Sequence, residues 1–329
     1  MSSPYTLEPH MSWNGARVLS ATMPAVEVSK YLPTFSRMPF GNGDNVNNYL
    51  EVISRDPFGG DKRLIPVATV SKRYALLQHT ELISKVVKAL EGLKGTGGLP
   101  LDVSPGDEAK VVLSEFGERL ECSVYFKRLA VDPGDGHPIS LRLFLRNSVD
   151  GSCAFEVSLR WFRQVCSNGM CVLTKQDRLR AIHHLDRINP TEFQNFLKSR
   201  LPVSLEHASL FNQWLGIRVT EDDLRKWIQM DVSKAWGPHA AARVLHVCMS
   251  GYDGRVGGTA GKKVRTDELF VSSDSAVPGA IVPAKCLYHV YQALTWVAER
   301  RTNIEERENW SNSTLALTRT LAKKLKPPA

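Results

Sequence analysis

Cys166 carries the most reactive side chain that stands in a motif-like setting. It follows a run of strand-forming residues in the stretch SLRWFRQVCSNGM, residues 158–170. A nucleophilic cysteine needs a general base beside it and N–H groups that stabilise a developing anion. Residues 167–169 could offer N–H groups at a turn, but no motif links His183 or His184 to this cysteine. A cysteine-dependent enzyme therefore stays one hypothesis, and a buried thiol beside a tight turn is the simpler interpretation.

The glycine-rich stretch GYDGRVGGTAGKKVR, residues 251–265, is the second place where chemistry could occur. It contains the glycines and lysines of a phosphate cradle but lacks the spacing Gly-x4-Gly-Lys-Ser/Thr. The stretch therefore predicts either a flexible arm that touches a nucleic-acid backbone or a plain surface loop.

Metal and cofactor chemistry have no motif in this sequence. The histidines include no His-Glu-x-x-His, and His239 and His246 are seven residues apart. The six cysteines include no Cys-x-x-Cys pair, and the acidic residues form no paired-carboxylate motif. The mixture ERRTNIEERE, residues 299–308, is typical of a solvated helix face. We expect no catalytic residue, metal, cofactor or small-molecule substrate.

Composition places the chain among ordinary globular proteins. Of its 329 residues, 43% are hydrophobic and 23% are charged, and no run of about 18 uncharged apolar residues is present. The first residues lack the basic start and apolar run of a secretory signal, so we expect a cytoplasmic protein without a membrane partner. The net charge of +8 favours nucleic-acid partners.

The elements that must position these residues indicate an α+β fold. A strand followed by a helix over residues 64–93 precedes two antiparallel hairpins, over 110–126 and 139–165. Helices are expected near residues 177–187, 190–200, 204–216, 220–229, 238–249 and 284–301. This order predicts a sheet of antiparallel hairpins covered by helices, with a helical C-terminal part. We expect an extended N-terminal segment (1–60), an α+β core domain (61–235) and a helical C-terminal region with a basic glycine-rich loop and a lysine-rich tail (236–329).

The second hairpin has one apolar face and one polar face. Leu141, Leu143 and Leu145 alternate with polar residues, and a three-residue loop at 149–151 would match the apolar sets of the two strands. The polar face interleaves cations with aromatic rings, which is what a single-strand platform needs. The candidate nucleic-acid-binding residues are Arg142, Phe144, Arg146, Arg160, Phe162, Arg163, Tyr125 and Lys127, with Lys262, Lys263 and Arg265 from the glycine-rich loop. The alternative is that the rings lie under a second layer and the arginines pair with acids such as Glu156.

The stretch RNSVDGSCAFEVSLRWFRQVCSNGM, residues 146–170, resembles the signature of a phage- and plasmid-borne family, the domain of unknown function 932. Residues 67–82 and 287–300 resemble the N-terminal segment and the closing helix of that family. The resemblance implies a mobile-element setting and supplies no established catalytic residue. The order of helix, hairpins and helices also loosely resembles the core of single-strand annealing proteins, which is a likeness of fold alone.

The leading hypothesis is a mobile-element DNA-binding protein without enzymatic chemistry. It would hold single-stranded DNA on the polar sheet face, in recombination or replication, and could anneal strands as a homo-oligomer. The arginines would grip phosphates, the phenylalanines would stack on bases, and the loop lysines would close over the strand. The alternatives are a protein-interaction module, such as an anti-defence factor, and the cysteine-dependent enzyme.

Overall fold

Alternating apolar residues build a main sheet, as the sequence predicted, and the protein has an α+β fold. The computed structural model describes residues 3–13, 15–91, 107–132, 134, 136–163, 168–170, 178–181, 190–257 and 265–325. The chain forms two compact units whose segments alternate along the sequence. Unit 1 consists of Met1–Leu129, Leu141–Leu159 and Lys175–Val203, and unit 2 of Ala130–Ser140, Arg160–Thr174 and Ser204–Ala329.

The main sheet has the strand order β1-β2-β6-β7-β8-β9-β10, and β11 also pairs with β9. Its strands are β1 (Thr6–Trp13), β2 (Ala16–Pro24), β6 (Glu108–Ser114), β7 (Arg119–Val131), β8 (Ile139–Ser148), β9 (Phe155–Arg163), β10 (Asn168–Met170) and β11 (Arg178–Ala181). The pairs β1–β2, β2–β6, β6–β7, β9–β10 and β9–β11 are antiparallel. Strands β7, β8 and β9 contribute residues to both units.

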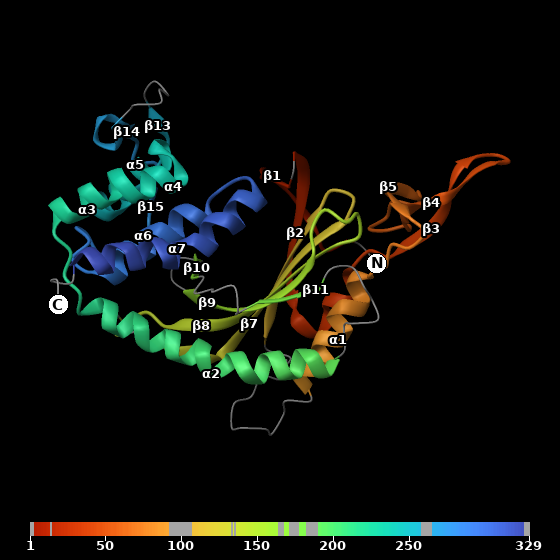
Figure 1. Ribbon diagram of the computed structural model, residues 1–329, viewed down its shortest axis with the longest axis horizontal. Helices are drawn as coiled ribbons and strands as arrows, with labels where there is room; N and C mark the ends of the chain where they lie inside the picture. Colours follow the sequence, from red (N-terminus) through yellow and green to blue (C-terminus); the bar gives the residue numbers. More distant parts are fainter. Residues whose placement is uncertain are drawn as a thin grey trace. The chain divides into compact units, whose positions relative to one another are not determined.

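One face of this sheet carries the expected apolar set. Leu141, Leu143 and Leu145 on β8 are buried, and so are the alternating apolar residues of β7. Helix α1 (His79–Glu91) buries its own apolar stripe, and α2 (Pro190–Leu215) begins with Phe193, whose ring meets Phe155 of β9 edge to face. Figure 1 shows α1 and the start of α2 on the same side of the strands. The burial of this face supplies the main driving force for folding unit 1.

Two glycines with positive φ close the hairpins of unit 1. Gly117 (φ +78°) turns the chain between β6 and β7, as expected, and Gly151 (φ +75°) lies in the link from β8 to β9. That link covers residues 149–154, so the expected three-residue loop is wrong. The reason is Ser148, whose hydroxyl oxygen accepts from the Cys153 N–H and donates to the Cys153 carbonyl, at 3.0 Å each.

A buried imidazole joins the hairpin turns to the start of α1. His79 Nε2 donates to the Gly117 carbonyl at 2.9 Å, and His79 Nδ1 accepts from the Asn147 side-chain amide at 3.0 Å. The same amide donates to the Leu77 carbonyl at 3.2 Å. Burial penalises the charged imidazole and lowers the pKa of His79 to about 4, although the hydrogen bond to the Gly117 carbonyl acts to raise it.

A smaller three-stranded sheet in unit 1 has the order β3-β4-β5. Its strands are β3 (Phe35–Asn42), β4 (Asn45–Arg55) and β5 (Ile65–Ser71), and the 3-10 helix η1 (Ala25–Tyr31) precedes them. Phe35, Ile53 and Val70 form a core cluster with Val149. The expected extended N-terminal segment, 1–60, is thus folded into strands and a short helix.

Unit 2 is mainly helical. It contains the end of α2 and the elements α3 (Glu221–Trp227), the π-helix η4 (Ile228–Val232), α4 (Ser233–Trp236), α5 (Pro238–Ser250), α6 (Leu287–Glu299) and α7 (Ile304–Leu325). Thr220 caps α3 by accepting from the Asp223 N–H at 3.2 Å. The rings of Trp236 and Trp310 stack with centroids 4.8 Å apart. The expected helix at 284–301 is confirmed as α6, whose apolar stripe is buried.

Three expected helices differ in the structure. Residues 178–181 form strand β11 against β9, and the helices expected at 190–200 and 204–216 form the single helix α2. No helix among the described residues is both long enough and apolar enough to cross a membrane.

The low pKa of His79 predicts a pH-dependent loss of stability. A folded-state pKa of about 4 lies below the ordinary value of 6.5. The unfolded chain therefore binds the proton first, and the contribution of His79 to stability is present above pH 6.5 and is lost as the pH falls toward 4. The loss at pH 4 is about 3 kcal/mol. Urea denaturation at pH 7.5 and pH 4 measures the free energy of unfolding. Between these two pH values it should fall by about 3 kcal/mol less in His79→Gln than in the wild type.

The matched control is His239→Gln, because His239 is an exposed histidine of α5. This variant should keep the full pH dependence of the wild type. An unchanged pH dependence in His79→Gln would contradict the neutral, hydrogen-bonded imidazole.

Candidate nucleic-acid interface

The polar face of the main sheet holds a buried ion pair in unit 2. Arg160 on β9 is 2% exposed, and its guanidinium donates to both carboxylate oxygens of Glu308 on α7, at 2.8 and 2.5 Å. The side-chain amide of Asn312 donates to the same carboxylate at 3.1 Å. A fork of two charge-assisted hydrogen bonds is strong in a site without water, so this arginine is committed to Glu308.

The two other candidates at the centre of this face are buried as well. Arg142 and Phe144 lie on β8, and the Arg142 Cζ lies 5.7 Å from the centroid of the Phe144 ring. Arg146 is half-buried, with its Cζ 5.8 Å from the centroid of the buried Trp13 ring. The expectation that Arg142, Phe144 and Arg160 stand on an open, wet face is therefore wrong. The alternative, in which this face lies under a second layer, describes these three residues. The acid that pairs with Arg160 is Glu308, whereas Glu156 was the example expected.

The remaining candidates have different surroundings. Tyr125 and Phe162 are half-buried. Arg163 and Lys127 lie on β9 and β7, with side chains outside the described part of the structure, and Lys262 and Lys263 lie outside the described residues. Arg265 is exposed, with its Nε 4.0 Å from a carboxylate oxygen of Glu268.

The first residues of the glycine-rich stretch and the residues that follow it form a β-ribbon. It is built from β12 (Tyr252–Asp253), β13 (Val256–Gly257), β14 (Phe270–Val271) and β15 (Ser275–Ala276). β12 pairs with β15 and β13 with β14, both antiparallel, and the 3-10 helix η5 (Thr266–Glu268) leads into β14. We call residues 252–257 and 265–276 the ribbon. Gly254 is needed because a Cβ there would lie 2.0 Å from the Ser272 carbonyl oxygen.

A single carboxylate fixes the base of the ribbon. Asp253 is buried and accepts from the Arg243 guanidinium at 2.8 and 2.6 Å. It also accepts from the Trp296 indole at 2.9 Å and from the Gly254 N–H at 2.9 Å. These donors lower the pKa of Asp253 below its ordinary value, although burial acts to raise it. Because Arg243 belongs to α5 and Trp296 to α6, the ribbon is tied to both helices.

The fixed ribbon exposes cationic and aromatic side chains. The side chain of Arg255 is 93% exposed and Phe270 is 72% exposed, while Tyr252 and Arg265 are also exposed. On the other side, Val271 packs with Leu269 and Ala242 of α5 in a small core. Guanidinium groups can bind phosphates and exposed rings can stack on bases, so the ribbon provides what the sheet face was expected to provide.

Sequence reasoning missed Tyr252, Arg255 and Phe270 as candidates. The available signal was the short alternation Leu269-Phe270-Val271, which places Phe270 opposite the two apolar residues that pack inward. The stretch before residue 258 gives little indication of a strand, because glycines interrupt it.

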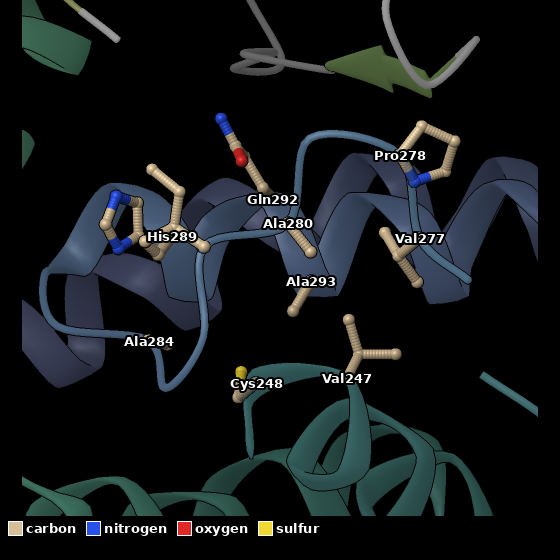
Figure 2. Close-up of a pocket in the computed structure, with 10 residues that line it drawn as sticks. Val247, Cys248, Val277, Pro278, Ala280, Ala284, His289, Gln292 and Ala293 are labelled. Atoms are coloured by element: carbon tan, nitrogen blue, oxygen red, sulfur yellow. The ribbon is translucent and has the colours of Figure 1, made fainter. Parts of the chain in front are cut away.

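A small hollow beside α5 and α6 has an apolar lining with two polar side chains. Figure 2 shows Val247 and Cys248 of α5 on one side, His289, Gln292 and Ala293 of α6 on another, and residues of the 277–284 loop around them. Burial raises the pKa of the Cys248 thiol to about 12, so it is protonated at neutral pH and is no nucleophile. The polar side chains of the hollow are therefore His289 and Gln292, and its thiol is not a nucleophile. Among the described residues, no group of His, Cys, Asp and Glu is placed to hold a metal ion.

Removing one partner of the Arg160–Glu308 pair should destabilise the protein strongly. Glu308→Gln leaves the Arg160 charge buried without its counter-ion and should lower the free energy of unfolding by about 3–5 kcal/mol. The double variant Arg160→Met/Glu308→Leu should recover most of this loss, because both charges of the pair are replaced by apolar side chains. Urea denaturation measures both.

The control for this pair is Glu306→Gln, which removes the partner of Arg301 at a more exposed position. It should cost no more than about 1 kcal/mol. A Glu308→Gln variant as stable as this control would contradict the buried ion pair.

Asp253→Asn should loosen the ribbon without unfolding unit 2. The variant keeps one carbonyl oxygen but loses the charge that holds Arg243. Trypsin should then cleave after Arg255 and Arg265 several-fold faster than in the wild type, as read by mass spectrometry. Asp222→Asn, which alters an exposed ion pair on α3, serves as the control. Equal cleavage rates in the two variants would show that the Asp253 carboxylate does not hold the ribbon.

Comparison with known proteins adds one finding. No curated protein and no solved structure matches this chain. The model of the domain of unknown function DUF932 matches residues 66–319, a range that contains the main-sheet strands from β6 onward, the ribbon and helices α1–α6. The match covers more than half of the 329 residues. The chain belongs to the DUF932 family, as the motif at residues 146–170 indicated.

Proposed function

We propose that this protein binds nucleic acid, with single strands preferred, through the exposed side of the ribbon. One combination of features carries this proposal. Asp253 holds the start of the ribbon in place, and the same ribbon exposes Arg255 and Phe270. A site that is held before the ligand arrives pays less ordering entropy on binding. The net charge of +8 supports attraction to a polyanion.

The exposed aromatic rings and arginines of the ribbon favour binding to single strands over duplexes. A base in a duplex is stacked on both faces, whereas the bases of a single strand can stack on Phe270 and Tyr252. The carboxylate next to Arg255 is held weakly, since the exposed Arg255 Nε lies 3.4 Å from Asp274. Exposed ion pairs of this kind contribute about 1 kcal/mol or less, so a phosphate can replace this carboxylate.

The polar sheet face has no part in this proposal, because Arg142, Phe144 and Arg160 are buried. The expected setting, recombination or replication on a mobile element, stays a prediction. Annealing of two strands likewise stays a prediction.

The cysteine-dependent alternative rests on Cys166, which lies outside the described residues. Among the described cysteines, burial raises the pKa of Cys122 and Cys248 to about 12 and also raises that of Cys153. These three thiols are therefore protonated at neutral pH and are poor nucleophiles. No observation on the described residues favours this alternative.

Binding to a labelled single-stranded oligonucleotide, followed by fluorescence anisotropy, tests the proposal. Affinity should fall as salt rises, with the slope set by the number of phosphates neutralised. Arg255→Ala/Arg265→Ala should lower that slope by about 1.4, or about 0.7 for each lost contact. Phe270→Ala should weaken binding by about 1–3 kcal/mol and leave the slope unchanged.

Two control variants alter side chains that are not part of the ribbon. Leu64→Ala removes another exposed apolar side chain, and Lys226→Ala removes another exposed cation. Both should bind as the wild type does. The proposal fails if the wild type does not bind the oligonucleotide, or if the ribbon and control variants bind equally.

A further inference from the structure

The β3–β4 hairpin extends past the sheet that holds its base. β5 pairs with β4 from Arg55 only as far as Leu50, while β3 and β4 continue to pair up to the contact of Asn42 with Asn45. Figure 1 shows the end of this hairpin running beyond β5. We call residues 38–49 the arm. Met38 and Pro39 lie opposite Val52 and Glu51, which β5 still pairs, whereas the outer part of the arm, residues 40–48, is a two-stranded hairpin without a third strand in the described structure. Such hairpins are marginally stable alone in water.

The arm exposes large apolar side chains. Tyr49 is 81% exposed, and Met38, Phe40 and Val46 are each about 40% exposed. Every residue from 38 to 46 is exposed. A cluster of exposed apolar side chains on an open strand pair is typical of an interaction surface.

The charge of the arm restricts its partner. Asp44 is the one charged residue among positions 38–49, whereas 23% of the whole chain is charged. A segment without any Lys or Arg gives a phosphate backbone no counter-charge, so nucleic acid is a poor occupant. The exposed apolar side chains of the arm favour a protein surface as its partner.

A second copy of this chain fits the charge pattern. The chain has a net charge of +8, so two copies repel each other overall as they approach. The arm avoids this repulsion, because its single charge is negative and opposite in sign to the net charge of the copy that it would meet. A two-fold arrangement lets each arm bind the other copy, which doubles the buried area.

We propose that the arm is a self-association element that docks on a second copy of this chain. Met38, Phe40 and Tyr49 supply the apolar contact. The arm lies before residue 66, where the match to the family model begins, so this contact is additional to the family region. It does not depend on nucleic-acid binding by the ribbon.

Light scattering coupled to gel filtration, without nucleic acid, tests the proposal. The wild type at tens of micromolar should have at least twice the 36.7 kDa mass of one chain. The variant Phe40→Ser/Tyr49→Ser should shift to the mass of one chain. Its far-ultraviolet circular dichroism should match the wild type, because both changed side chains are on exposed positions.

Met230→Ser is the matched control, since Met230 is an exposed apolar residue on η4, far from the arm in the sequence. It should retain the mass of the wild type. A wild type that elutes as a single chain would overturn the proposal. An assembly that survives Phe40→Ser/Tyr49→Ser, or that Met230→Ser breaks equally, would overturn it too.

Discussion

Burial of the Arg160 charge is the constraint on which the packing of β9 in unit 2 depends. A guanidinium keeps its proton at any physiological pH, so it can leave water only with a partner that supplies both charge and hydrogen-bond acceptors. Glu308 supplies both from α7, and Asn312 adds a further donor to that carboxylate. The end of β9 and helix α7 are therefore joined by charge within unit 2, and the arginine is withdrawn from any ligand.

The same residue types have different roles in different surroundings. Arg142 lies next to Phe144 in a buried layer, whereas Arg255 and Phe270 extend from an anchored ribbon into solvent. A cation and an aromatic ring close in sequence are thus insufficient to define a nucleic-acid site, because burial decides whether they stabilise the fold or bind a ligand. Asp253 has the same decisive role for the ribbon as Glu308 has for the sheet, since each carboxylate fixes an arginine and thereby an element.

The local sequence pattern predicted the elements in which buried apolar residues recur at a regular spacing. The alternation in β7 and the stripe of α6 repeat over many residues, and Thr220 carries its own capping signal, so these features could be read without coordinates. Strand β11 could not, because its four residues become a strand only by pairing with β9. Pro202 favours a break where α2 instead continues. The pairing of Glu308 with Arg160 spans 148 residues, and charge pattern alone holds no information about such a distant partner. The ribbon site was missed for a related reason, since exposure of Phe270 follows from the packing of its neighbours.

The imidazole of His79 also sets an order in which unit 1 can assemble. It bonds to the Gly117 turn, 38 residues later, and to Asn147, 68 residues later. Neither contact is available until the start of α1 and the two hairpins have come together, so these hydrogen bonds form only once distant parts of the chain are close. Such non-local closure slows folding relative to a helical bundle of equal stability. The two hairpins are consequently expected to acquire their final turns together, late in folding, rather than one after the other as the chain is made.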